Sequence, residues 1–410
     1  MNLERRAHEY LQTLCVTIPE RRVGSDGNRA ATEFFDRTMR ALGYETECPG
    51  FDCLDWTESG VDLHAGATSF QAHASPHSPG CRAGGALVVA STLQQLESVH
   101  ATDRILLLRG TLAAEPLMPR NFPFYNPEHH RHILHLLESH APQAILTAGA
   151  RNPALSGAAY PAPLIEDGDF DIPSAYLTEE AGERLAALAG AHVTLEIRAQ
   201  RRRARGCNVV ARCAPASARR LVFMAHIDSK RGTPGALDNA SGVAVLLLMA
   251  ELLAGASLPL GLEIVAVNGE DHYSNPGETL FLQSNQGRFD EITLGVNLDG
   301  VGDRDSASAY SLYGCTDDLA ATIRAALAPH PDLVEGPAWP QGDHMLLVLN
   351  GVPALAVTSA RADQLLAEVI HTPRDTPDGV DPSRLVRLAA ALRDLALRLA
   401  GESSRVCVGR

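Results

Sequence analysis

Near the N-terminus, apolar side chains recur every three or four positions, which is the spacing of one face of a helix. These side chains are Ala31, Phe34, Phe35, Met39 and Leu42. A turn sequence, Gly24–Gly27, precedes this stretch, and Gly43 follows it. Because glycine is common just beyond helix ends, we predict a helix over residues 28–42.

The middle of the chain has a different pattern. From about residue 48 to residue 84 it is rich in glycine, serine, proline and histidine and shows little periodicity. Short apolar runs then recur, and stretches with helical spacing lie between some of them. The runs cover residues 86–90, 105–108, 144–146 and 193–197, and the helical stretches cover 129–138 and 179–188. This alternation predicts a small mixed α/β unit, and the basic run Arg201–Arg205 after it is interpreted as a solvated connector.

In the second half, buried-type strands alternate with amphipathic helices. The predicted strands cover residues 221–225, 262–267, 295–298 and 354–358, and the predicted helices cover 240–253, 317–327 and 382–399. Such an order indicates a largely parallel sheet with helices on both faces. We therefore predict one α/β domain made of residues 1–50 and 206–410, interrupted by an inserted unit over residues 51–205.

Composition narrows the class of protein. The 410 residues are 45% hydrophobic and 20% charged, which is enough apolar material for a sizeable core and excludes a disordered chain. The formal net charge of −14 argues against a nucleic-acid partner, because phosphate neutralisation needs basic surface. No run reaches the roughly 18 consecutive apolar residues of a membrane span, so no membrane partner is expected. The charged start lacks an apolar segment and the eight cysteines form no CxxC pair, so we expect a cytoplasmic protein with buried or inert thiols.

Candidate chemistry gathers directly after the predicted strands. The six side chains concerned are His226, Asp238, Glu270, Asp271, Asp299 and His371, and Asp228 lies two residues after the first of them. In open α/β sheets, functional groups collect at the carboxyl ends of the strands. Imidazole and carboxylate are ligands that zinc takes in hydrolytic sites. Six such groups are more than one catalytic ion needs, whereas two ions that share one carboxylate, with another carboxylate left to carry protons, account for six.

Each of these residues also has a plain structural interpretation. Asp238 is placed to cap the helix that begins at Ala240, and a single buried histidine or aspartate is more often a satisfied polar residue than a ligand. The neighbours Glu270 and Asp271, however, follow an apolar strand, where two carboxylates repel each other unless a cation compensates. Recurrence of such groups at strand ends favours a metal centre.

Five ordered motifs carry a family resemblance. They are His226-x-Asp228, Gly235-Ala-Leu-Asp238-Asn239-Ala-Ser241-Gly242, Glu270-Asp271, Asn297-Leu-Asp299-Gly300 and His371-Thr-Pro-Arg-Asp375-Thr. With them the chain resembles the co-catalytic zinc aminopeptidases, which include bacterial leucyl aminopeptidases, aminopeptidase Y and the glutamate carboxypeptidases. The resemblance implies a three-layer α/β/α zinc-peptidase domain with a mostly parallel mixed sheet. The inserted segment, about residues 85–199, resembles a protease-associated domain.

The resemblance implies two zinc ions and their ligands, and other divalent ions are compatible with the same groups. Asp238 would bridge the ions, His226 and Asp299 would complete one site, and Asp271 and His371 would complete the other. Asp271 departs from the family pattern, because many members have glutamate at that position.

The resemblance also implies roles in catalysis. Glu270 would be the general base, and Asp228 would accept a hydrogen bond from the ring of His226. Asp375 is expected to orient the loop of His371. Several members have tyrosine just before the last histidine as an aid to the oxyanion, whereas this chain has Ile370.

These roles predict an aminopeptidase that hydrolyses N-terminal peptide bonds through a water activated by two zinc ions, with a peptide as its substrate. A homo-oligomer is compatible with the sequence. Two alternatives stay open: a single-zinc transferase like glutaminyl cyclase, and a binding module that has lost catalysis. The histidine-rich stretch His129–His135 is interpreted as a solvated helix rather than a second metal site, and His344 as a contact near the active site rather than a ligand.

Overall fold

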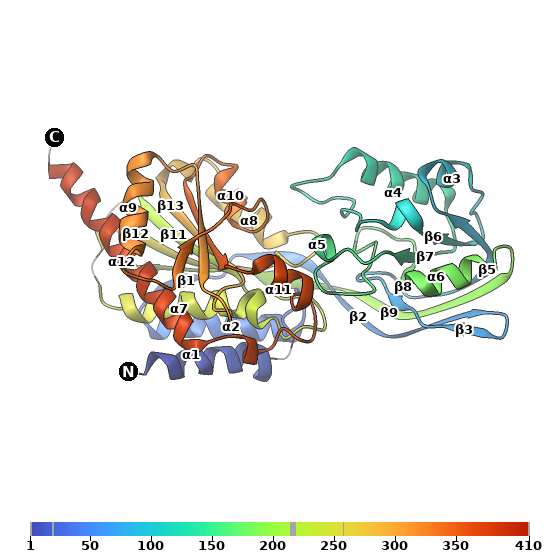
Figure 1. Ribbon diagram of the computed structural model, residues 1–410, viewed down its shortest axis with the longest axis horizontal. Helices are drawn as coiled ribbons and strands as arrows, with labels where there is room; N and C mark the ends of the chain where they lie inside the picture. Colours follow the sequence, from blue (N-terminus) through green and yellow to red (C-terminus); the bar gives the residue numbers. More distant parts are fainter. Residues whose placement is uncertain (1, 19, 214–218, 257, 409–410) are drawn as a thin grey trace. The chain divides into compact units, whose positions relative to one another are not determined.

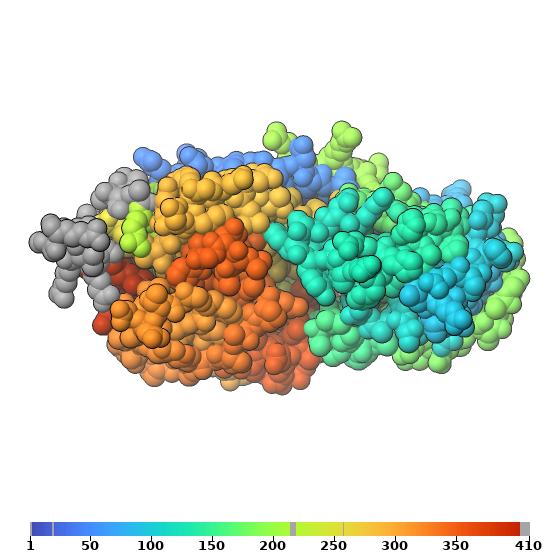
Figure 2. Space-filling view, turned by 90° about the horizontal axis from the view of Figure 1, so that it is seen from above, coloured from blue at the N-terminus to red at the C-terminus, as the bar shows by residue number. Residues whose placement is uncertain are grey.

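The computed structural model describes residues 2–18, 20–213, 219–256 and 258–408, with side chains up to residue 401, and it divides into two compact units (Figure 1). Unit 1 consists of residues 1–52 and 205–410, and unit 2 consists of residues 53–204. In Figure 2 the orange-to-red segments belong to unit 1, and the cyan segments belong to unit 2.

Unit 1 is built on an eight-stranded mixed sheet with the order β1-β10-β12-β11-β13-β16-β14-β15. The strands are β1 (Glu45–Glu47), β10 (Val209–Cys213), β11 (Arg220–His226), β12 (Gly261–Val267), β13 (Ile292–Leu298), β14 (Ser308–Tyr313), β15 (Leu333–Glu335) and β16 (Ala354–Ser359). The four strands predicted from apolar runs, β11, β12, β13 and β16, run parallel in the centre. β10 and β14 flank them in the antiparallel direction.

Helices cover both faces of this sheet. In β11, Leu221, Phe223 and Ala225 face one hydrophobic cluster, and Val222 and Met224 face another. The first cluster includes residues of α1 (Leu3–Gln12), α2 (Asp26–Ala41), α7 (Ser241–Leu253), α9 (Asp317–Leu327) and α12 (Pro382–Val408). The second includes residues of α8 (Pro276–Asn285) and α10 (His344–Val348). The predicted helices over 28–42, 240–253, 317–327 and 382–399 are confirmed, although α12 continues beyond its predicted end to Val408.

One helical stretch departs from the expected absence of membrane-type segments. Residues Ala236–Leu253 are long and apolar enough to cross a membrane by length and composition alone. However, 89% of this stretch is buried inside the protein, where its side chains pack around the central sheet. Its apolar character is therefore accounted for by its place in the core.

Unit 2 has its own eight-stranded mixed sheet, with the order β3-β2-β9-β5-β6-β7-β8-β4. The strands are β2 (Gly50–Ala65), β3 (Thr68–Phe70), β4 (His73–Ala74), β5 (Cys81–Ala90), β6 (Ile105–Leu108), β7 (Ala144–Gly149), β8 (Ser174–Thr178) and β9 (His192–Cys207). The helices are α3 (Leu93–Ser98), α4 (Glu128–His140), α5 (Pro153–Ser156) and α6 (Glu179–Ala186). Separate hydrophobic clusters lie on the two faces, because Ile105 and Leu107 of β6 belong to one and Leu106 and Leu108 to the other.

The run Arg201–Arg205 is mostly exposed and contains the boundary between the two units, as expected of a solvated connector, but it has strand conformation. These residues form the end of β9, a 16-residue strand. Arg201 is largely buried and its guanidinium pairs with Asp171 at 2.7 Å. Charged side chains are compatible with a strand when they alternate with inward-facing positions or find acidic partners at its surface.

Candidate metal centre

Three neighbouring parallel strands deliver side chains to one edge of the unit 1 sheet. His226 is the last residue of β11, and Asp299 follows directly after β13, the neighbouring strand. β12, on the other side of β11, leads into the loop that carries Glu270 and Asp271. Because the strands are parallel, their carboxyl ends meet at the same edge.

Asp238 lies between two imidazole rings. Its Oδ1 is 3.0 Å from Nε2 of His226, and its Oδ2 is 3.1 Å from Nε2 of His371. Nε2 of His226 is also 3.7 Å from Oδ1 of Asp299, and Nε2 of His371 is 3.3 Å from Oδ1 of Asp271. These residues form two sets. In the first, His226, Asp238 and Asp299, and in the second, Asp238, Asp271 and His371, the imidazole nitrogens and carboxylate oxygens lie within 4.8 Å of one another. The structure thus brings together the five expected ligands in two sets that share Asp238.

Several buried polar atoms of this cluster have no hydrogen-bond partner among the described residues. Both ring nitrogens of His226 and Oδ2 of Asp271 are in this state. Buried polar atoms without partners cost free energy, so native proteins satisfy them with protein groups, water or ions. Imidazole nitrogen and carboxylate oxygen form the donor set of hydrolytic zinc sites. The residues therefore fit a pair of divalent cations.

The electrostatics of the site point to the same conclusion. Burial lowers the pKa of His226, but three nearby carboxylates outweigh burial and raise that pKa well above its ordinary value. Burial also lowers the pKa of His371, whereas Asp238 and Asp271 raise it to about 10. Conversely, burial raises the pKa of Asp238, and the two imidazoles reverse this and bring it far below its usual range. The carboxylates therefore require positive charge beside them, which bound cations supply in place of protons.

Glu270 lies next to this cluster. One of its oxygens lies within 4.8 Å of ligand-type atoms of His226 and Asp271. Burial raises the pKa of Glu270 well above its ordinary value, the positive charge of His226 opposes the rise, and three neighbouring carboxylates add to it. A carboxyl group with a raised pKa beside a metal centre is suited to taking up and releasing a proton.

Asp228 supports the loop of Glu270 more directly than it supports His226. Its Oδ1 accepts a hydrogen bond from the backbone N–H of Gly269 at 2.7 Å, and its Oδ2 accepts one from Asp271 at 3.1 Å. Oδ1 is 3.6 Å from Nδ1 of His226, which is longer than a hydrogen bond. Asp228 therefore fixes the turn that carries Glu270 and Asp271.

Asp375 holds the turn of Asp238 rather than the ring of His371. Its carboxylate accepts hydrogen bonds from the backbone N–H groups of Leu237 at 2.7 Å and Asp238 at 3.1 Å. The side chain of Asn239, after a cis peptide bond, donates to the carbonyl of Leu298 at 2.7 Å. These bonds tie the Asp238 turn to the loop of His371 and to the end of β13.

Two carboxyl groups near Glu270 were missed by the sequence patterns. Glu278, 5% exposed, lies in the first turn of α8, and Asp343, 1% exposed, comes just before α10. Burial raises the pKa of both groups, to about 7 for Asp343. An acidic residue in the first turn of a helix is ordinary, so only its burial distinguishes Glu278 from a solvated one.

His344 is fully buried beside this region. Its Nε2 faces the carbonyl oxygen of Trp339 at 3.1 Å, and burial lowers its pKa. Since a carbonyl accepts hydrogen bonds, Nε2 carries the hydrogen in the neutral ring. His344 belongs to neither of the two ligand sets.

In unit 2, the structure gathers two histidines of α4 around Glu115. Oε1 of Glu115 is 3.2 Å from Nε2 of His129 and 3.2 Å from Nε2 of His130. Nδ1 of His130, however, accepts a hydrogen bond from the backbone N–H of Met118 at 3.0 Å. Nε2 of the neutral ring therefore carries a hydrogen and donates to Glu115, which leaves no lone pair for a metal.

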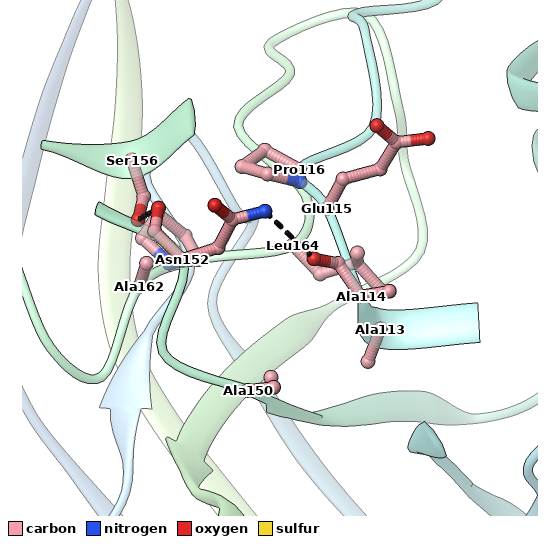
Figure 3. Close-up of a pocket in the computed structure, with 11 residues that line it drawn as sticks. Ala113, Ala114, Glu115, Pro116, Ala150, Asn152, Ser156, Ala162 and Leu164 are labelled. Atoms are coloured by element: carbon pink, nitrogen blue, oxygen red, sulfur yellow. Dashed lines mark hydrogen bonds between the residues drawn. The ribbon is translucent and has the colours of Figure 1, made fainter. Parts of the chain in front are cut away.

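Glu115 also lines a small cleft in unit 2 with an empty volume of about 250 Å³ (Figure 3). Most of its lining residues are apolar or small, and Asn152 donates a hydrogen bond to the carbonyl of Ala114 at 3.2 Å. This cleft contains none of the side chains that the sequence motifs single out.

Solved structures show a fold similar to that of this chain. An aminopeptidase from Aneurinibacillus sp. strain AM-1 is 20% identical, with 97% of this chain and 93% of that chain covered and a TM-score of 0.75. A zinc aminopeptidase from Bacillus subtilis is 18% identical over 96% and 93% of the two chains, with a TM-score of 0.72. A glutaminyl cyclase from Macrostomum lignano is 15% identical over 97% and 90%, with a TM-score of 0.53. At these identities the likeness shows the fold.

A family model gives the more specific match. No curated protein sequence matches this chain. Residues 208–396 match the model of peptidase family M28, and this range contains both ligand sets together with Glu270. Residues 208–396 of the chain are therefore identified as a segment of the peptidase family M28 type.

Proposed function

We propose that this protein is a zinc-dependent aminopeptidase, which hydrolyses the N-terminal peptide bond of a peptide with Glu270 as general base. The observation that carries the proposal is the position of Asp238, whose two carboxylate oxygens face His226 and His371 inside the segment that matches the peptidase family. Two proteins of similar fold, an aminopeptidase from Aneurinibacillus and a zinc aminopeptidase from Bacillus subtilis, support it.

Two zinc ions are proposed, although other divalent cations suit the same ligands. His226, Asp238 and Asp299 would hold one ion, and Asp238, Asp271 and His371 would hold the other. When bound, zinc is a Lewis acid that makes water more acidic and stabilises negative charge on a carbonyl oxygen.

Glu270 would move the proton. Its carboxylate accepts a proton from the attacking water and returns it to the leaving amine, which needs a pKa near neutrality. Burial and the neighbouring carboxylates raise the pKa of Glu270 in the required direction. Asp228 keeps this group in place through its two hydrogen bonds to the turn of residues 269–271.

The remaining proposals concern the whole chain. We propose that the inserted segment, residues 51–205, is a protease-associated-like domain, because it contains a separate sheet with hydrophobic clusters of its own. A cytoplasmic location and a homo-oligomeric state are also proposed. The first rests on composition, and a measurement of mass in solution tests the second.

Metal content and substrate form test the proposed function together. We expect about two zinc per chain, hydrolysis of aminoacyl-anilides and short peptides, and no hydrolysis after N-acetylation of the same substrates. A chelator should abolish activity, and added zinc should restore it. One zinc per chain with cyclisation of N-terminal glutamine would instead support the transferase alternative, and a metal-free, inactive protein would support the binding module.

A further inference from the structure

Arg21 is a buried charged residue that lies outside the segment matching the peptidase family. Only 1% of its surface is exposed. Four hydrogen bonds from its guanidinium go to backbone carbonyls. Nε donates to Ile227 at 3.0 Å, Nη1 donates to Leu14 and Pro234 at 2.7 Å each, and Nη2 donates to Gly235 at 2.8 Å.

Three of the four carbonyls that Arg21 contacts belong to the two loops of the metal centre, and the fourth is that of Leu14 in the N-terminal segment. Ile227 lies between His226 and Asp228, and Gly235 begins the turn that leads to Asp238. A guanidinium is planar and presents its N–H groups in a fixed fork, so bonds to both loops also fix their spacing. Arg21, from the N-terminal segment, therefore connects the loop of His226 with the turn of Asp238, the residue that both ligand sets share.

The Asp238 turn is held from its other side by Asp375. Arg21 binds carbonyl oxygens before the turn, whereas Asp375 binds the N–H groups of Leu237 and Asp238. Burial raises the pKa of Asp375 to about 6, and the positive charge of Arg21 opposes that rise. The turn is thus fixed between a buried guanidinium, which donates to its carbonyls, and a buried carboxyl group, which accepts from its N–H groups.

The fit around Arg21 is close. Gly235 has φ +60°, and a Cβ atom there would lie 2.8 Å from Nη2 of Arg21 and 2.4 Å from the carbonyl oxygen of Asp238. Glycine is therefore required for the guanidinium to reach the turn.

We infer that Arg21 is a positioning residue of the metal centre, which holds the His226 loop against the Asp238 turn and so sets the affinity for the bound cation. The inference rests on the proposed function, since it assigns a new residue to the same site. Replacement of a residue that orients metal ligands without binding the metal typically lowers metal affinity or activity by roughly 10- to 100-fold.

The test compares Arg21→Gln and Arg21→Lys with Arg22→Ala. Arg22 is the control, because it is the neighbouring arginine and its guanidinium pairs with Glu20 at 2.7 Å. Zinc affinity is measured by competition with a chromogenic chelator, and the geometry of the centre by the visible spectrum of the Co²⁺-loaded protein. We expect zinc binding roughly 10- to 100-fold weaker in Arg21→Gln, a smaller loss in Arg21→Lys, and a changed Co²⁺ spectrum in both. At saturating zinc, kcat should fall while KM stays close to that of the parent.

Two results would overturn the inference. One is a folded Arg21→Gln protein with parental zinc affinity and an unchanged Co²⁺ spectrum. The other is failure of both Arg21 variants to fold by circular dichroism, which would place the role of Arg21 in the core of unit 1. The proposed function is judged separately on the parental protein: a parent that binds zinc but hydrolyses no peptide would refute the peptidase and leave the affinity comparison valid.

Discussion

At the scale of single residues, Asp238 has the greatest influence, because both ligand sets depend on it. Its two oxygens face different imidazoles at 3.0 and 3.1 Å. Its backbone is fixed by Asp375 and by the hydrogen bond of Asn239 to β13. The removal of this one carboxylate leaves two side chains for each cation, fewer than the three that a catalytic zinc site usually has.

Asp238→Ala is therefore expected to lose both ions rather than one. Metal analysis of the dialysed protein checks this, and circular dichroism shows whether the variant is folded. Retention of two zinc per chain in a folded variant would count against a shared ligand.

Glu270→Gln should separate catalysis from metal binding. The amide cannot take up the proton, so we expect hydrolysis to fall by about 10²- to 10⁴-fold. Because Glu270 belongs to neither ligand set, zinc content should equal that of the parent, and this is the control. A variant with parental turnover of aminoacyl-anilides would show that another group is the base.

The sequence patterns identified the residues of this site that follow strands, because the carboxyl ends of parallel strands meet. They did not identify Arg21, Glu278 or Asp343. Arg21 acts across more than 200 positions of the chain through backbone carbonyls, which leave no trace in a sequence. Asp343 precedes a five-residue helix, and nothing in its neighbours marks it as buried.

At the scale of elements, the junction of α7 with β13 decides where the Asp238 turn lies. Oδ1 of Asn239 accepts a hydrogen bond from the N–H of Gly242 at 3.1 Å. A Cβ atom on Gly242 would lie 2.4 Å from that oxygen and 2.7 Å from the carbonyl oxygen of Leu298. The start of α7 therefore approaches β13 more closely than any side chain at this position permits.

Gly242→Ala should push α7 away from β13 and disturb Asp238 with it. We expect a loss of about 1–3 kcal/mol in the free energy of unfolding, together with weaker zinc binding. Gly379→Ala is the control, since nothing lies within 4 Å of the position of its added methyl group. Urea unfolding and zinc titration measure the two effects; equal stability of the two variants would show that the close approach is relaxed at little cost.

Long apolar runs made the central strands predictable from the sequence, whereas strands with more polar residues were not predicted. β14 (Ser308–Tyr313) has serine at positions 308 and 311, yet most of it is buried between β15 and β16. β2 (Gly50–Ala65) contains four acidic side chains and one histidine, and only some of its positions face inward. For such strands, tertiary pairing rather than local composition sets the conformation.

At the scale of the whole molecule, charge balance at the metal centre should determine how stability depends on pH. The raised pKa values of His226 and His371 in the metal-free protein lie above the unfolded value of about 6.5. The stabilisation is fully present below that pH and is lost as pH rises through the folded values, about 10 for His371. Asp343, with a pKa raised to about 7, acts in the same direction because its ionised form is disfavoured in the fold.

We therefore expect the thermal midpoint of the EDTA-treated protein to fall between about pH 6 and pH 10. The zinc-loaded protein should lose less over the same range, because bound cations replace the protons of the imidazoles. Differential scanning fluorimetry of both forms measures the thermal midpoint. A midpoint of the metal-free protein that rises with pH would contradict the raised pKa values of the two histidines and Asp343.

The separation of the chain into two units predicts how the molecule responds to loss of metal. Each unit has its own hydrophobic clusters, and all five proposed ligands belong to unit 1. A ligand that binds only the native state stabilises the part that binds it. Calorimetry should therefore show two transitions, of which EDTA lowers only the one that limited proteolysis assigns to unit 1. Asp238→Ala provides the control, since its transitions should not respond to EDTA, and an equal shift of both transitions in the parent would mean that the units unfold together.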